Sequence, residues 1–133
     1  MESLHFSSQE KLKSKKSIDL LFKKGDRLFH YPLQLVFAPT EHEESVRFKA
    51  AFSVPKKYHR HAVVRNKLKR RVKESFRLLA PRLRKRLEEK GERLNFMFVY
   101  ISKEELTYNT IDKAVASLLR DLMNLDKAER SSK

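Results

Sequence analysis

Lys and Arg side chains crowd one short stretch of the sequence, and cations at this density can neutralise a row of phosphates. The stretch HAVVRNKLKRRVKESFR, residues 61–77, has seven Lys or Arg within the thirteen positions from Arg65 to Arg77. Glu74 is the only acidic residue among them. Like charges at i,i+4 spacing weaken an isolated helix, so we expect an anionic partner to offset the repulsion.

A charge run can also be a solvated helix face or a tail, and the apolar residues inside the run distinguish these readings. On a helical wheel for residues 62–79, five apolar residues share a sector about 120° wide: Val64, Leu68, Val72, Phe76 and Leu79. A second sector of similar width forms what we call the basic ridge: Asn66, Lys69, Arg70, Lys73 and Arg77. Tails do not keep an apolar stripe in register. We therefore predict a packed helix that presents the ridge, with mere solubilisation as the alternative.

The positive charge is concentrated in one part of the chain. Residues 55–90 carry fifteen Lys or Arg against three acids, whereas the segments before and after carry nine against seven and seven against seven. The formal net charge is +14. Localised charge of this kind is typical of proteins that bind polyanions. Nucleic acid is the first candidate, because a helix lying on an anionic membrane would need a broad apolar face with Trp or Phe.

The sequence shows no catalytic machinery. There is no Cys, no Gly-rich phosphate loop and no nucleophile motif, and acids are sparse where the cations gather. His59 and His61 have no nearby carboxylate to complete a metal site, so no protein metal site is predicted. No apolar run is long enough to span a membrane. We expect a cytoplasmic protein with no membrane partner.

The helices and strands that must position the ridge are predicted from the spacing of apolar residues and from the positions of Gly and Pro. We predict a helix over residues 11–24, with Ser17 as a candidate N-cap and Gly25 at its end. Strands over residues 31–38 and 46–54 are expected to form an antiparallel hairpin. The basic helix of residues 62–79 should stop near Pro81, and residues 82–90 should form a second, short helix.

Two further elements complete the prediction. Residues 95–101 are apolar on both alternating faces, which suits a central strand. Ser102 and Glu105 make a candidate capping box for a C-terminal helix whose core stripe is Ile111, Val115, Leu118, Leu122 and Leu125. The order α-β-β-α-(α)-β-α predicts an α+β fold in a single domain over residues 1–133, an RNA-binding domain if the polyanion is RNA. The order of residues 1–10 and 127–133 stays open.

The segment SVPKKYHRHAVVRNKLKRRVKESFR resembles the signature of the bacterial ribonuclease P protein subunit. The residues that carry the resemblance are Ser53, Val54, Lys56, Lys57, Ala62, Val63, Arg65, Asn66, Lys69 and Arg70. The connector at residues 58–61 lacks the Gly of many members and looks one residue longer. The order of elements fits from about Leu12 to Leu125.

The resemblance implies a four-stranded sheet with a left-handed β-α-β crossover. It also implies a subunit of an endoribonuclease whose RNA carries the active site. That RNA, with Mg2+ bound mainly by the RNA, removes the 5′ leader of precursor tRNA. The partners would be ribonuclease P RNA and precursor tRNA, with no protein partner required. The chain alone is not expected to cleave, and no residue is catalytic.

Two sets of site residues follow. The RNA subunit would contact Lys56, Lys57, Arg65, Asn66, Lys69, Arg70, Lys73 and Arg77. The leader would enter a cleft between the N-terminal helix and the sheet, with candidates Phe22, Phe37, Arg47 and Lys49. A core role is the alternative for Phe22, and ordinary solvent exposure is the alternative for Arg47 and Lys49. Ile18 stands where many relatives have an aromatic residue. A ribosomal or other structural RNA-binding protein remains a second function, and a DNA-binding module a third.

Overall fold

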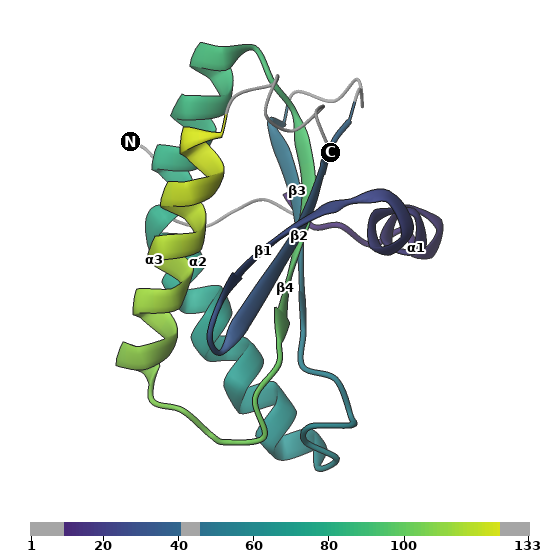
Figure 1. Ribbon diagram of the computed structural model, residues 1–133, viewed down its shortest axis with the longest axis vertical. Coiled ribbons are helices and arrows are strands. Elements are labelled where there is room, and N and C mark those ends of the chain that lie inside the picture. Colours follow the sequence, from purple (N-terminus) through teal and green to yellow (C-terminus); the bar gives the residue numbers. More distant parts are fainter. Residues whose placement is uncertain (1–9, 41–45, 126–133) are drawn as a thin grey trace.

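A mixed β-sheet lies between two helices on one side and one helix on the other. The computed structural model describes residues 10–40 and 46–125. Its elements are α1 (Lys15–Lys24), β1 (Asp26–His30), β2 (Leu33–Pro39), β3 (Phe48–Ser53), α2 (Ala62–Lys90), β4 (Leu94–Tyr100) and α3 (Tyr108–Asn124). Figure 1 shows α2 and α3 on one face of the sheet and α1 on the other. The α+β class and the four-stranded sheet agree with the prediction. The terminal stretches whose order was open lie outside the described residues, except for Glu10.

The strands run in the order β1-β2-β4-β3. β2 pairs antiparallel with both β1 and β4, and β3 pairs parallel with β4. The predicted hairpin between residues 31–38 and 46–54 is therefore wrong, because β4 lies between those two strands. β4 is apolar on both faces, so it is most stable in the interior of the sheet, where both faces are shielded from water. α2 connects the parallel pair β3 and β4, and the handedness of this crossover stays a prediction.

The actual hairpin joins β1 and β2, and β1 was missed. β1 has five residues, and Asp26, Arg27 and His30 break its apolar pattern. Leu28 alone of this strand packs against the main core. A strand with so short and weak an alternation gives little periodicity to detect.

The main core fills the space between the sheet and the pair α2 and α3. Phe48 of β3, Phe76 of α2 and Phe96 of β4 are fully buried, with ring centroids 5.5 Å apart in each pair. Such edge-to-face and tilted aromatic contacts contribute about 0.5–1.5 kcal/mol each beyond area burial. The apolar stripe predicted for the basic helix faces this core, which fixes the helix's rotation about its own axis.

α1 packs on the opposite face of the sheet through a smaller apolar cluster. Leu21 is buried there against Val36, Met97 and Val99. The N-cap is Ser14, whose hydroxyl accepts the Ser17 N–H at 3.2 Å, and not Ser17 as predicted. Gly25 ends the helix as expected. A Cβ at this position would lie 2.5 Å from the Leu21 carbonyl oxygen of α1 and 3.0 Å from the Phe37 carbonyl oxygen of β2, so the close approach of the chain to both requires glycine.

α2 is one continuous helix of 29 residues that passes through Pro81. The predicted break at Pro81 is wrong. Ala80, Leu83 and Leu87 extend the buried stripe beyond it, and their packing offsets a proline cost of about 3 kcal/mol. The helix ends at Gly91, which adopts φ 66° and donates its N–H to the Glu88 carbonyl at 3.1 Å.

α3 begins later than the predicted capping box. Thr107 is the N-cap and accepts the Thr110 N–H at 3.2 Å, whereas the Ser102 hydroxyl accepts the Glu104 N–H within the preceding loop. The predicted core stripe is confirmed, since Ile111, Val115, Leu118 and Leu122 are buried and Leu125 packs at the core's margin.

A short N-terminal segment lies along the outer edge of β3. Lys11 forms an isolated parallel bridge with Ala50, and the Leu12 N–H donates to the Ala50 carbonyl at 2.8 Å. Just before it, the Glu10 carboxylate accepts two hydrogen bonds from the Arg84 guanidinium, at 2.7 and 2.9 Å. This segment therefore ties β3 to the second half of α2.

Candidate nucleic-acid interface

The basic ridge lies on the outward side of the first half of α2, as predicted. Asn66, Arg70 and Lys73 are exposed, and Lys69 and Arg77 are half-buried. Leu68, Val72 and Phe76 on the opposite side of the helix are buried. Among the ion pairs between described residues, none involves Lys69, Arg70 or Lys73. Their charge is thus available to an anionic ligand.

Arg77 differs from the rest of the ridge. Its Nε donates to Glu74 Oε2 at 3.0 Å, and this hydrogen bond raises the pKa of Arg77. The neighbouring Glu74 offsets most of its charge toward a ligand. Arg77 therefore marks the end of the ridge at which positive potential falls.

Arg65 supports the connector that precedes the helix. Its Nη1 donates to the carbonyl oxygens of His59 at 3.2 Å and Arg60 at 2.7 Å. His59 is itself buried, with Nε2 2.8 Å from the Ser102 carbonyl oxygen. These contacts hold residues 58–61, a connector that contains no glycine. Arg65 thus stabilises the loop that presents Lys56 and Lys57.

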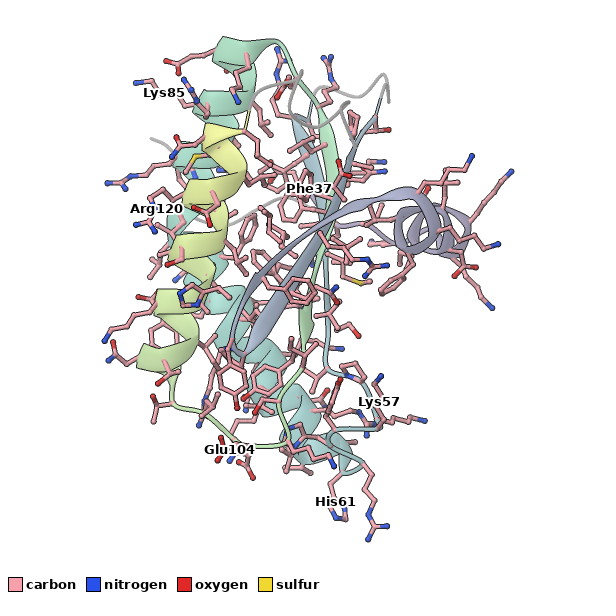
Figure 2. All side chains as sticks on the ribbon, in the orientation of Figure 1. Phe37, Lys57, His61, Lys85, Glu104 and Arg120 are labelled. Atoms are coloured by element: carbon pink, nitrogen blue, oxygen red, sulfur yellow. The ribbon has the colours of Figure 1, made fainter. Side chains whose placement is uncertain are left out.

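Lys56 and Lys57 are exposed at the end of the molecule where α2 begins. Figure 2 shows Lys57 and His61 projecting there, away from the sheet. The side chains of Lys56, Lys57, Arg60 and His61 surround a depression of about 450 Å³. This basic end is continuous in sequence with the ridge, because α2 starts at Ala62.

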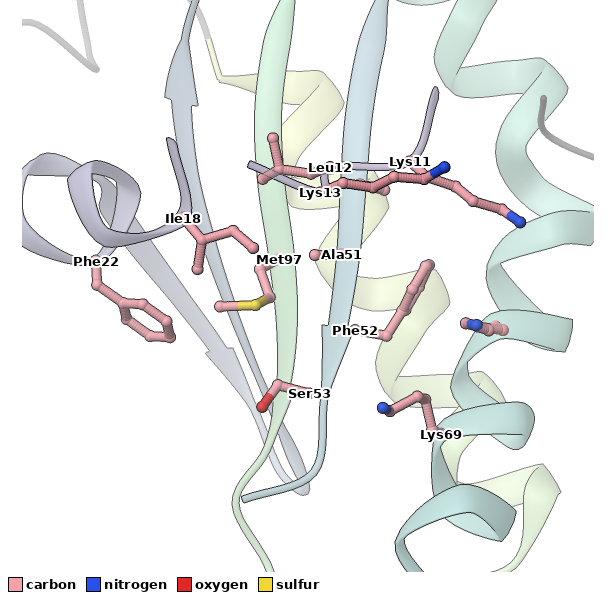
Figure 3. A pocket seen from close by; sticks show the side chains of 12 residues that line it. Lys11, Leu12, Lys13, Ile18, Phe22, Ala51, Phe52, Ser53, Lys69 and Met97 are labelled. Atoms are coloured by element: carbon pink, nitrogen blue, oxygen red, sulfur yellow. The ribbon is translucent and has the colours of Figure 1, made fainter. Parts of the chain in front are cut away.

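A groove runs between α1, the exposed face of the sheet and α2. Its volume is about 480 Å³. The residues that line it are Lys11, Leu12, Lys13, Ile18, Phe22, Ala50, Ala51, Phe52, Ser53, Lys69, Lys73 and Met97. Figure 3 shows apolar side chains on its floor and lysines around them. Lys69 and Lys73 belong to both the ridge and the groove, so the two surfaces are continuous.

The groove is strongly positive. None of its lining residues is acidic. Partial burial lowers the pKa of Lys73, and the nearby charges of Lys69 and Lys11 lower it further. Mutual repulsion among these lysines is relieved when a phosphate lies between them.

Two aromatic residues border the groove, and they are differently placed. Phe52 stacks on Phe98 at 5.9 Å and lies under the Lys73 ammonium, so its ring is committed to the protein. Phe22 is 38% exposed, and the Arg27 guanidinium lies 5.7 Å from its centroid. Arg27 also donates to the Phe22 carbonyl at 2.7 Å, which fixes the pair. Phe22 is therefore the aromatic residue of the groove with surface to offer a base.

Three of the predicted cleft residues do not line the groove. Phe37 is fully buried between the sheet and the helices α2 and α3, so its assignment to the cleft is wrong (Figure 2). The assignment failed because alternation along β2 puts Val36, and not Phe37, on the groove face. Arg47 and Lys49 are half-buried on the groove side of the β3 alternation, but they are not among the lining residues.

Sequence reasoning missed several residues of the groove. Lys11 and Lys13 enter it because the N-terminal segment follows β3, which only the tertiary structure brings about. Met97 reaches it from the two-sided strand β4. The i,i+4 spacing of Ile18 and Phe22 was a usable signal, because it puts both residues on one side of a helix.

Two further findings concern the described residues only. None of their helices is both long and apolar enough to cross a bilayer. No three of their His, Asp or Glu side chains gather as ligands for a metal ion.

Comparison with known proteins identifies the family. The family model described as Ribonuclease P matches residues 6–123. The ribonuclease P protein component of Porphyromonas gingivalis is 31% identical over 115 residues, which are 86% of this chain and 84% of that protein. The fold resembles the RNase P protein of Staphylococcus aureus, with a TM-score of 0.63, 20% identity and coverage of 85% and 94% of the two chains. It resembles that of Thermotoga maritima equally, with a TM-score of 0.63, 22% identity and coverage of 84% and 96%. This chain therefore belongs to the ribonuclease P protein family, and it is a subunit of that ribonucleoprotein.

Proposed function

We propose that this subunit binds ribonuclease P RNA through the basic ridge and holds the 5′ leader of precursor tRNA in the groove. The observation that carries the proposal is the sharing of Lys69 and Lys73 between the two surfaces. One continuous positive surface can neutralise phosphates of two RNA strands that would otherwise repel each other. Lys56 and Lys57, held out by the connector, extend the RNA-subunit contact.

The groove suits a single strand better than a duplex. Its floor is apolar, its rim is lysine, and Phe22 presents an aromatic surface beside Arg27. Proteins that bind single strands combine a basic track for the backbone with aromatic stacking for the bases. Ile18 lies beside Phe22 in the groove, where an aromatic residue would allow a second base to stack. Because Ile18 has no ring, it would contact a base through van der Waals packing only.

The proposed division of labour leaves the chemistry to the RNA. Mg2+ would be bound mainly by the RNA, and the protein's lysines would lower the metal concentration needed by screening phosphate charge. No residue of the chain is assigned a catalytic role, no second protein is required, and the complex would act in the cytoplasm.

Reconstitution tests the proposal. The purified chain is added to its ribonuclease P RNA at low Mg2+ with precursor tRNA, and 5′ cleavage is followed. We expect strong stimulation over the RNA alone and no cleavage by the protein alone. Absence of stimulation at every Mg2+ concentration below the optimum of the RNA alone would refute the proposal.

A further inference from the structure

We propose that the single-strand path does not end in the groove but continues across the sheet to Phe29 on β1, where a further leader nucleotide stacks. This rests on the proposed leader binding. Phe29 is 64% exposed, which is more than Phe22, Tyr31 or Tyr108. A single exposed apolar side chain is ordinary, so the argument depends on where this one lies.

Strand register places Phe29 on the same face of the sheet as the groove. Phe29 pairs with Gln34, Gln34 with Val99, and Val99 with Ser53, which lines the groove. Paired residues project to the same side of a sheet. This row crosses three strand spacings, a distance of about 14 Å. Val99 in this row is 6% exposed and packs in the apolar cluster of α1, so a ligand that leaves the groove at Ser53 would reach Phe29, at the other edge of the same face, by way of Gln34.

Arg27 connects Phe29 to the groove along β1. It precedes Phe29 by two positions, so both side chains project to one face, about 7 Å apart. Its guanidinium is already fixed against the Phe22 ring. Aromatic rings and guanidinium planes are the groups on which unpaired RNA bases stack. Phe22, Arg27 and Phe29 thus form a line of three stacking groups.

Charge favours the same occupant. The acidic residue of β1, Asp26, pairs with Phe37 of the main core and so projects to the opposite face. The groove face of β1 therefore presents one cation and one ring. The cation can contact the backbone of a single RNA strand, and the ring can stack on a base. Because this face of β1 is continuous with the groove, the strand that we expect here is the leader.

Leader length supplies the test. Holoenzyme assembled with the full chain is titrated with precursor tRNAs whose leaders are shortened one nucleotide at a time. Phe29→Ala should weaken binding of long-leader substrates about five- to tenfold, which is the lower part of the range for loss of one base–aromatic stack. Binding of the substrates with the shortest leaders should not change. Phe29→Tyr should retain the affinity. Leu78→Ala, which removes a 48% exposed side chain from α2, is the matched control and should have no effect.

A spectroscopic readout separates stacking from indirect effects. The chain has no Trp, so Phe29→Trp introduces a single indole, whose fluorescence can be excited separately from that of the four Tyr. Its emission should be quenched by long-leader substrates and not by the shortest ones. Equal weakening for all leader lengths in Phe29→Ala, or unquenched emission from Phe29→Trp, would overturn the inference. If wild-type affinity itself shows no dependence on leader length, leader binding and the role of Phe29 fall together. If that dependence is present in wild type and identical in Phe29→Ala, the role of Phe29 alone falls.

Discussion

The two halves of α2 are similarly rich in Lys and Arg but use them differently. In the first half, Lys69, Arg70 and Lys73 face outward and form no ion pair with described residues. In the second half, Arg84 binds Glu10, while Arg86 and Lys90 donate to the Met123 carbonyl at 3.3 and 3.1 Å. Charge density alone does not separate a binding cation from a structural one, and neither does the half of the helix: Lys67 of the first half pairs with Glu105, and Arg82 and Lys85 of the second half are exposed.

The second half uses its cations as ties between distant segments. α3 has no basic residue in its last turn, and Arg86 and Lys90 of α2 supply donors to its terminal carbonyls instead. Cations at a helix C-terminus also interact favourably with the helix dipole. These residues would be poor ligands for RNA, because binding phosphate would break the contacts that they already make.

The largest expected effect is a loss of RNA affinity when residues in the first half of α2 are replaced. Replacing Lys69 and Arg70 together by Ala should weaken RNA affinity about a hundredfold, if each side chain makes one charge-assisted hydrogen bond to a phosphate. The dependence of log affinity on log salt should fall by roughly one unit for each phosphate that is no longer neutralised. Filter binding across a salt series measures both. Arg65 is left intact because its hydrogen bonds hold the connector.

A double variant in the second half is the control for this test. Arg82 and Lys85 are exposed there, and their replacement by Ala removes the same formal charge. The salt dependence should stay close to that of the wild type. If both double variants weaken binding equally, the contrast between the two halves is wrong.

The next largest effect is on stability, from the second half. Arg84→Ala leaves Glu10, which is 5% exposed, without its guanidinium partner. The free energy of unfolding should fall by about 2–4 kcal/mol, below the full range for a buried pair because the Arg84 side chain is 24% exposed. Urea denaturation measures the change. Arg82→Ala should alter stability by no more than about 0.5 kcal/mol. A stable Arg84→Ala protein would show that the tie contributes nothing.

The smallest expected effect is that of Lys73, a residue whose replacement should change both RNA binding and stability. Lys73→Met keeps the apolar stem and removes a charge repelled by Lys69 and Lys11, so the melting temperature should rise about 1–2 °C while RNA affinity falls. Because the pKa of Lys73 is lowered in the folded state, the unfolded chain binds more protons just below the ordinary value of 10.5. Wild-type stability should therefore gain from this group as pH rises through that window, and Lys73→Met should lack the gain. Lys113→Met, an exposed change on α3, serves as control.

The parts of the fold that local pattern determines were predictable. The apolar stripe of the basic helix and that of α3 recur at helical spacing, and each buries the residues expected of it. The ridge followed directly, because residues opposite a buried stripe must face outward. Phe22 was assigned to the groove by family position, and its exposure beside Ile18 agrees with that placement.

The parts that distant contacts determine were not predictable. The parallel pairing of Phe48 with Leu94 and of Phe52 with Phe98 joins residues on either side of α2, and no local signal distinguishes it from a hairpin. The side of β2 on which Phe37 lies depends on the register of β2 against β4, because a shift of one residue exchanges the two faces of a strand. Continuity of α2 through Pro81 likewise depends on its packing, which outweighs a strong local preference.

The Glu10–Arg84 ion pair sets an order of events during synthesis. Its two residues are 74 positions apart, so the segment that emerges first from the ribosome must wait for the middle of the chain before it can dock. Until then the N-terminal segment, which carries Lys11 and Lys13 of the groove, lacks its ion pair with α2. The first half of α2, with its basic ridge, is therefore synthesised before the ion pair that ties the N-terminal side of the groove to α2 can form.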